Sequence, residues 1–258
     1  MWDKIKLIWQ GFFASKPPLE LSYTKVSIFR FCPWKYKLIY EDGYRIPPNP
    51  YISLGLSVHR ALEAFHKDGH KDQEVLFEIY NQVWVNEGFQ NPQQAVHFYD
   101  KGRKMLERYF EFAQERKSEI FGVEKEFRFT LGRRVVRGII DRIDRLPDQT
   151  YEVIDYKTHA EMWEQTRIDN DLQLTLYTLG CSRALNIQPS HLSYFFLAHN
   201  KSVSTQRSRE QLDKALFDLE AVAKEIERGK YVPDTSKCVK CDFKLSCVHS
   251  SLRSANGR

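Results

Sequence analysis

Alternation between apolar and polar residues is clearest in the middle of the chain. From Arg137 to Thr158 (RGIIDRIDRLPDQTYEVIDYKT), two runs rich in Ile, Val and Tyr flank residues 146–150, which have the composition of a turn. This pattern predicts a β-hairpin. A period of two in the second run divides its side chains between two faces, with Val153, Asp155 and Lys157 on one face and Ile154 and Tyr156 on the other. A carboxylate and an ammonium two residues apart, beside a strand that carries Asp141, are an unusual arrangement for stability alone.

Other periodicities predict the elements around this hairpin. Apolar residues at helical spacing predict helices over residues 53–69, 73–87, 93–115, 166–185 and 212–229. Alternating or continuous apolar runs predict strands over residues 120–131, 191–198 and 201–205. Near the N-terminus, Ser22 or Thr24 can cap a helix, and Pro33 can open the next one. Because the hairpin follows the strand over residues 120–131, the order predicts a three-strand meander and then a helix, in a chain of the α/β class.

Length and composition predict a single domain. The 258 residues are 42% hydrophobic and 14% aromatic, which is enough apolar surface for one packed core. No run reaches the roughly 18 apolar residues of a membrane span, and the first residues suit an amphipathic lead-in better than a signal peptide. We therefore expect a cytoplasmic protein in four parts: a lead-in (1–20), an N-terminal helical part (21–118), a sheet core (119–206) and a C-terminal helix with a cysteine region (207–258).

The charge balance permits a polyanionic partner but does not require one. Lys and Arg number 39 against 34 Asp and Glu, which gives a formal net charge of +5. Many proteins with such a mild excess bind no nucleic acid. Thirteen Tyr, five Trp and seventeen Phe could stack on bases, although most such residues form core.

Three cysteines gather near the C-terminus in a C-x2-C-x5-C pattern, at Cys238, Cys241 and Cys247. In an intracellular protein such a set is a metal site more often than a disulfide framework, and a fourth thiol is needed to complete it. Cys32 is the available partner, and the spacing alone favours zinc. Cys181 has no motif partner and is expected to be a buried thiol.

Further candidate site residues lie on either side of the hairpin. His59 follows Gly55 near the start of a predicted helix, where a surface or core-edge histidine is the alternative. Glu124 or Glu126 could approach a metal from the neighbouring strand, but a solvated strand face is favoured for both. Downstream, residues spaced four apart share one face of the predicted helix 166–185, and these are Asp169, Gln173 and Tyr177.

Six short motifs follow one another along the chain. They are C-P (32–33), G-x3-H (55–59), G-x2-D-R-x-D (138–144), D-Y-K-T (155–158), Q-x3-Y (173–177) and C-x2-C-x5-C (238–247). Each motif is weak alone, but in this order they resemble the RecB-like branch of the PD-(D/E)xK nuclease superfamily. The cysteines resemble its iron–sulfur members, which include CRISPR-associated RecB-like exonucleases and AddB-type nuclease domains. The one departure is Asp155, where many relatives carry Glu.

This resemblance implies a restriction-endonuclease-like core, a mixed sheet flanked by helices with helical insertions. It implies a metal-dependent DNA nuclease, an exonuclease on single-stranded ends in DNA repair, recombination or CRISPR adaptation. The sequence holds no P-loop of the G-x4-G-K-[ST] type, so we do not expect this chain to unwind duplexes by itself. The resemblance implies DNA as a partner, together with an integrase or a helicase as a protein partner. The alternative is a catalytically inactive, nuclease-like scaffold that binds DNA.

The resemblance also implies roles for individual residues. A Mg²⁺ or Mn²⁺ ion would be held by His59, Asp141, Asp155 and the main-chain carbonyl of Tyr156. Lys157 would orient or deprotonate the attacking water, or stabilise the phosphate charge, and Gln173 and Tyr177 would hold Lys157 or the phosphate in place. A [4Fe-4S] cluster, with zinc as the alternative, would be held by Cys32, Cys238, Cys241 and Cys247.

Overall fold

The computed structural model describes residues 17–252, and within them the strands form one mixed sheet. The strands are β1 (Glu20–Leu21), β2 (Glu119–Leu131), β3 (Arg134–Arg145), β4 (Tyr151–Lys157), β5 (Pro189–Phe196) and β6 (Lys201–Thr205). Strand β3 pairs with β2 on one edge and with both β1 and β4 on the other, and β5 and β6 follow β4. The β4–β5 and β1–β3 pairs are parallel and the rest are antiparallel. The predicted meander of β2, β3 and β4 is confirmed.

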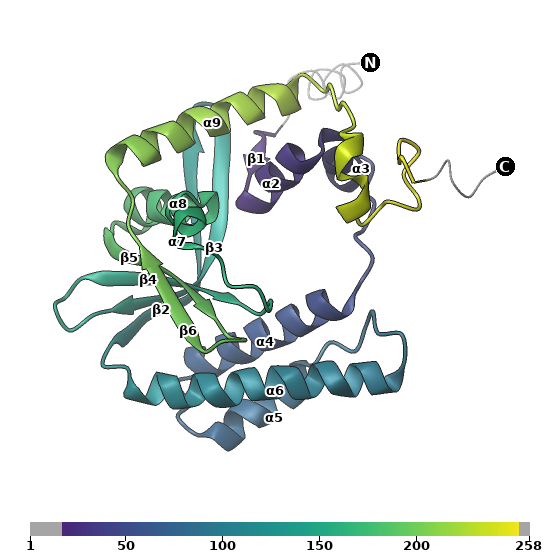
Figure 1. Cartoon of the computed structure of the whole chain (residues 1–258). Coiled ribbons are helices and arrows are strands. Elements are labelled where there is room, and N and C mark those ends of the chain that lie inside the picture. The colour runs from purple at the N-terminus through teal and green to yellow at the C-terminus, as the bar shows by residue number, and fades with distance from the viewer. Residues whose placement is uncertain (1–16, 253–258) are drawn as a thin grey trace, which may run out of the picture.

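Helices cover both faces of this sheet (Figure 1). They are α2 (Tyr23–Phe31), α3 (Pro33–Tyr40), α4 (Pro50–Lys67), α5 (Gln73–Val83), α6 (Pro92–Glu115), α7 (Gln165–Asp169), α8 (Leu172–Gly180) and α9 (Arg209–Glu227). One apolar core joins the sheet to α2, α8 and α9, and a second joins the opposite face to α4, α5 and α6. The predicted α/β class, with a mixed sheet flanked by helices, is confirmed.

The hairpin of β3 and β4 forms as its alternation predicts. Its turn places Gln149 in the left-handed region (φ 70°), and the Asp148 carboxylate accepts hydrogen bonds from the backbone and hydroxyl of Thr150. Val153 packs into the core beneath α8, while Ile154 and Tyr156 pack into the core beneath α4 and α6. Adjacent residues of β4 therefore reach opposite layers of the molecule.

The prediction of a single helix over residues 166–185 is wrong. The backbone is extended at Asp171 (ψ 130°), whose carboxylate accepts hydrogen bonds from the main-chain N–H groups of Gln173 and Leu174 and so caps α8. The chain therefore forms α7, then α8, then a short π-helical segment (Cys181–Leu185). Asp169 lies before the break and accepts hydrogen bonds from Gln165 and Thr205, so it does not share the face of Gln173 and Tyr177.

Other boundaries move by a few residues for identifiable reasons. Helix α4 begins at Pro50 because Asn49 accepts hydrogen bonds from the first N–H groups, whereas Ser53 is buried inside the helix. Ser22, and not Thr24, caps α2. The expected lead-in falls mostly on residues 1–16, which lie outside the described residues, and the four-part division of the chain remains a prediction. None of the helices in the described part is long and apolar enough to cross a membrane.

Candidate active site and cysteine pocket

The strands β3 and β4 separate at the candidate site. Their ladder ends at the pair Arg142–Ile154, so the next residues, Asp141 and Asp155, face each other without a backbone pair. Instead, the Tyr156 N–H donates a 2.8 Å hydrogen bond to Oδ2 of Asp141. From α4, Nδ1 of His59 lies 3.4 Å from the same oxygen. The opening of the hairpin thus creates a concave site that two strands and one helix line.

Asp155, Lys157, Gln173 and Tyr177 form one connected group, as the sequence predicts. Asp155 is 2% exposed, and its Oδ1 accepts hydrogen bonds from Nε2 of Gln173 (2.7 Å) and from the Tyr177 hydroxyl (3.1 Å). Its Oδ2 lies 2.6 Å from the Lys157 ammonium in an ion pair. The ammonium also donates to Oε1 of Gln173 at 3.0 Å. Gln173 therefore uses both ends of its amide to fix the carboxylate and the ammonium relative to each other.

The charge states follow from these contacts. Burial lowers the pKa of Lys157, but the Asp155 carboxylate outweighs burial and raises it above its ordinary value. Burial raises the pKa of Asp155, and Lys157 offsets that shift in part. At neutral pH the pair is ionised, and Lys157 is a cation.

Glu124 joins the site from β2, against the expectation of a solvated strand face. It has a left-handed backbone (φ 47°), and the β2–β3 register skips it between Val123–Arg142 and Lys125–Ile140. This conformation interrupts the alternation, which is why a pattern of period two could not place the side chain. Burial, and then the nearby Asp141 carboxylate, raise the pKa of Glu124 to about 7. Glu126 is exposed, as expected.

One set of side chains in the described part of the chain has the spacing of a metal site. Ligand atoms of His59, Glu124 and Asp141 all lie within 4.8 Å of one another. Burial lowers the pKa of His59, but the neighbouring Asp141 outweighs it and raises that pKa to about 9, so a metal would displace a proton there. Two carboxylates and an imidazole suit Mn²⁺ or Mg²⁺.

The predicted ligands Asp155 and Tyr156 stand outside this three-residue group. Oδ2 of Asp155 is buried and accepts no hydrogen bond of ordinary geometry from the described residues, so it retains a free acceptor site beside Lys157. Coordination by Asp155 and by the Tyr156 carbonyl therefore remains a prediction, and the free acceptor fits it.

An open pocket of about 360 Å³ lies over these groups. Its wall includes two side chains that the motifs do not identify, Tyr51 at the start of α4 and His159 just after β4. Beneath Lys157, the ring of Tyr194 lies 4.6 Å from the ammonium, and its hydroxyl donates to Asp171 at 2.6 Å. Tyr51, His159 and Tyr194 lie in apolar or loop segments, and the sequence pattern of these segments does not indicate a site.

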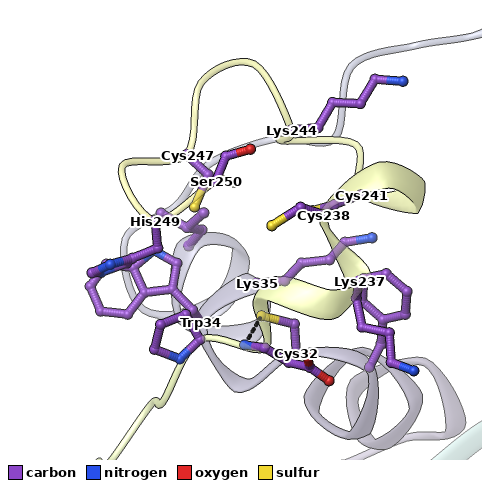
Figure 2. A pocket seen from close by; sticks show the side chains of 14 residues that line it. Cys32, Trp34, Lys35, Lys237, Cys238, Cys241, Lys244, Cys247, His249 and Ser250 are labelled. Atoms are coloured by element: carbon purple, nitrogen blue, oxygen red, sulfur yellow. Dashed lines mark hydrogen bonds between the residues drawn. The ribbon is translucent and has the colours of Figure 1, made fainter. Parts of the chain in front are cut away.

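The four motif cysteines line a second pocket (Figure 2). This pocket is formed by one segment before α4 and one segment after α9. Cys32 lies between α2 and α3, and the other three belong to the segment after α9. Sγ of Cys32 accepts a hydrogen bond from the Asp234 N–H at 3.4 Å. All four cysteines lie among the described residues, and no three of their sulfurs lie within 4.8 Å of one another. Cys181 is fully buried elsewhere, as expected.

The fold and the site together define a nuclease-like α/β protein with an acidic, metal-competent pocket. The model of the PD-(D/E)XK nuclease superfamily matches residues 20–248, so the chain belongs to that superfamily. Its members generally use divalent metals. The predicted restriction-endonuclease-like fold is thereby confirmed, whereas assignment to the iron–sulfur branch remains a prediction.

Two sequence relatives and one solved structure extend this comparison. Both relatives are named as a subunit of an ATP-dependent helicase/deoxyribonuclease. The chain is 31% identical over 182 residues to the one from Streptococcus equi subsp. zooepidemicus, and 25% identical over 178 residues to the one from Streptococcus pyogenes. Each alignment covers 64% of this chain but only 16% of the relative. A solved structure from Eubacterium rectale, provisionally named an exonuclease, is 11% identical with a TM-score of 0.54, over 92% of this chain and 93% of that one, and shows likeness of fold alone.

Proposed function

We propose that this chain is a divalent-metal-dependent DNA nuclease. The observation that carries the proposal is the convergence of Asp141, Asp155 and Lys157 with His59 and Glu124, at the point where the hairpin opens. Structural ion pairs rarely need three carboxylates and a histidine in one open pocket. Such a set suits phosphodiester hydrolysis, in which an attacking water must be activated and charge on the phosphate must be neutralised.

The residues would divide this work according to their charge. His59, Glu124 and Asp141 would hold the ion, with Asp155 as a further ligand. A bound Mn²⁺ or Mg²⁺ would supply Lewis-acid activation of the phosphate and of a water. Lys157 is paired with Asp155 and is cationic at neutral pH, so it would stabilise phosphate charge or orient the water rather than remove its proton. Gln173 and Tyr177 would hold Asp155 and Lys157 in this arrangement.

We further infer an exonuclease acting on single-stranded ends. The sequence relatives carry a name that joins helicase and deoxyribonuclease, so a helicase is the favoured partner and an integrase is the alternative. The matched part of the chain corresponds to only 16% of each relative. A role for this chain in a complex with a helicase is therefore part of the proposal.

We also propose that the cysteine pocket holds a [4Fe-4S] cluster. All four motif cysteines line one pocket, which supports a group held by four thiolates. The order of the motifs, which resembles that of the iron–sulfur nucleases, favours a cluster over a single zinc ion. Its role would be structural, since it joins the first helices to the last segment.

The nuclease proposal is tested with end-labelled DNA. Wild-type protein with Mn²⁺ should degrade linear single strands and leave a closed single-stranded circle intact. Asp141→Asn and Lys157→Gln should each lower the rate by about 100-fold or more, because each removes charge from the reacting centre. Asp148→Asn is the matched control, since this exposed carboxylate lies in the turn of the same hairpin.

Two results would contradict the proposal. Equal activity in wild type and Asp141→Asn would identify a contaminating nuclease. Absence of cleavage on every strand and with every divalent metal would favour the inactive, DNA-binding scaffold.

A further inference from the structure

Tyr156 lies between Asp155 and Lys157 in sequence, yet its side chain points away from them. Because side chains alternate along β4, its ring enters the core beneath α4 and α6, where it is 3% exposed. Arg142 stands in the same relation to Asp141 on β3 and is 4% exposed. Each strand therefore carries a candidate metal ligand on one face and, directly beside it, a buried polar side chain on the other.

Tyr109 of α6 joins these two buried side chains. Its hydroxyl oxygen lies 2.6 Å from the Tyr156 hydroxyl and accepts a hydrogen bond from Nη1 of Arg142 at 2.9 Å. Nε2 of His66 lies 2.7 Å from the same oxygen. A phenol offers one donor and two acceptor positions, and these three partners use all of them if His66 accepts. Burial and Arg142 lower the pKa of His66 to about 3, so its ring is neutral and can accept.

This link lies where the backbone ladder fails. The last ladder pair of β3 and β4 is Arg142–Ile154, and beyond it the strands hold no common backbone hydrogen bond. Two side-chain links span the gap. The first runs from the Tyr156 N–H to Asp141 on the metal face. The second runs from Tyr156 through Tyr109 to Arg142 on the buried face.

Arg142 is itself fixed at its other end. Its Nε and Nη2 atoms donate to the two oxygens of the Asp144 carboxylate at 2.5 and 2.8 Å. Asp144 belongs to the paired part of the ladder, opposite Glu152. The bidentate ion pair is therefore a rigid anchor, and the separation of the opened strands depends on the hydroxyl contacts that extend from it.

We propose that Tyr109 and Tyr156 are positioning residues that fix the separation of Asp141 and Asp155 at the metal site. Their side chains lie on the buried face and touch neither the metal nor the substrate. They act by replacing the missing backbone ladder with buried hydrogen bonds that end on the neighbours of both carboxylates. The inference rests on the proposed function, because it describes the geometry of the metal site that function requires.

The test uses Tyr156→Phe, which removes one oxygen and keeps the ring. Binding of Mn²⁺ alone is followed by the loss of the free-ion paramagnetic resonance signal, and DNA cleavage is measured at saturating metal. Partners of this kind alter metal affinity or activity by about 10–100-fold. We expect Tyr156→Phe and Tyr109→Phe to weaken Mn²⁺ binding and to lower kcat by about tenfold each, with KM for DNA unchanged. The double variant should lose no more than the worse single one, because both substitutions break the same link.

Tyr80→Phe is the matched control. Tyr80 is a fully buried tyrosine in the same core, and its hydroxyl donates to the Tyr99 carbonyl at 3.2 Å, away from both strands. It should lose comparable thermal stability while keeping wild-type metal binding and cleavage. The inference is overturned if wild type is active and Tyr156→Phe, Tyr109→Phe and the double variant all bind Mn²⁺ and cleave DNA as well as the Tyr80→Phe control does. A wild type that neither binds Mn²⁺ nor cleaves overturns the proposed function and, with it, this inference.

Discussion

Glu124 occupies a backbone conformation that an L-residue adopts only at a cost. Its φ of 47° lies in the left-handed region, where a side chain costs about 1–2 kcal/mol. Its carboxylate is also half-buried beside Asp141, and burial, followed by the Asp141 charge, raises its pKa to about 7. Both penalties fall at the position whose carboxylate lies within 4.8 Å of ligand atoms of Asp141 and His59. Strain of this kind is typical of functional sites.

Glu124→Gly should therefore separate stability from metal binding. Glycine adopts this φ freely but loses about 0.5–1 kcal/mol more through the entropy of the unfolded chain. We expect the free energy of unfolding to stay equal to the wild-type value or to rise by up to about 1 kcal/mol, since strain and charge repulsion are removed. Mn²⁺ affinity should fall. Urea unfolding and metal titration measure the two quantities.

Glu126→Gly is the control for this substitution. Glu126 is an exposed residue two positions along the same strand, paired with Ile139. There glycine should destabilise by about 1 kcal/mol and leave Mn²⁺ binding unchanged. A Glu124→Gly protein that is less stable than Glu126→Gly would contradict the assignment of strain to position 124.

His66 makes stability depend on pH. Burial, and then Arg142, lower its pKa in the folded protein to about 3, against about 6.5 in an unfolded chain. Between these values the unfolded chain binds a proton that the folded protein does not, so the free energy of unfolding falls as pH falls. The loss from pH 7 to pH 5 should be about 2 kcal/mol.

Substitution of this one histidine tests the sign and the size of the effect. His66→Gln keeps an acceptor for the Tyr109 hydroxyl but does not titrate. Urea unfolding at pH 7 and pH 5 should show a difference smaller by about 2 kcal/mol in this variant than in wild type. Parallel pH profiles of the two proteins would assign the acid sensitivity to other groups.

At the scale of elements, α6 depends on a close approach to its neighbours. A Cβ built on Gly102 would lie 2.1 Å from the Tyr80 hydroxyl of α5 and 2.9 Å from a methyl of Leu54 of α4. Gly102 is thus the point at which three helices meet on one face of the sheet. Their packing sets the position of Tyr109, seven residues further along α6.

Gly102→Ala should destabilise the protein although alanine favours helix. Overpacking a core typically costs about 1–3 kcal/mol, whereas replacing glycine within a helix gains about 1 kcal/mol. The expected net loss is up to about 2 kcal/mol by urea unfolding. At Gly55 of α4, the nearest atom to a new Cβ is Oγ1 of Thr158 at 3.4 Å, so Gly55→Ala should be neutral or stabilising. Equal effects at both positions would contradict the packing argument.

At the scale of the whole molecule, the cysteine pocket joins the beginning of the described chain to its end. Cys32 lies beside the segment that follows α9, and the Asp234 N–H contacts its sulfur. A cluster in this pocket would close a loop of about two hundred residues. Because the closed loop lowers the entropy of the unfolded chain, the folded protein would be stabilised by a few kcal/mol.

Cys238→Ser should therefore remove broad visible absorption from the purified protein and lower its melting temperature. Cys181→Ala is the control, because that buried thiol lies outside the pocket and should leave the absorption unchanged. A colourless wild type that contains one zinc per chain would contradict the cluster and support the zinc alternative.

Sequence alone determined the features that depend on local order. The hairpin, the faces of β4 and the four-residue spacing of Gln173 and Tyr177 follow from short-range periodicity, and the structure has all three. Prediction from periodicity failed where a side-chain hydrogen bond changes the backbone. At Asp171, capping hydrogen bonds divide the helix predicted over residues 166–185.

Only the tertiary structure decided the features that depend on distance in space. The left-handed backbone of Glu124 interrupts the regular alternation of β2, so a period of two does not predict the direction of its side chain. The hydrogen bond between Tyr109 and Tyr156 joins a helix to a strand 47 residues further along the chain. The meeting of the four motif cysteines in one pocket also depends on two segments about two hundred residues apart. Periodicity reports which residues share a face, whereas these features arise from how separate elements pack.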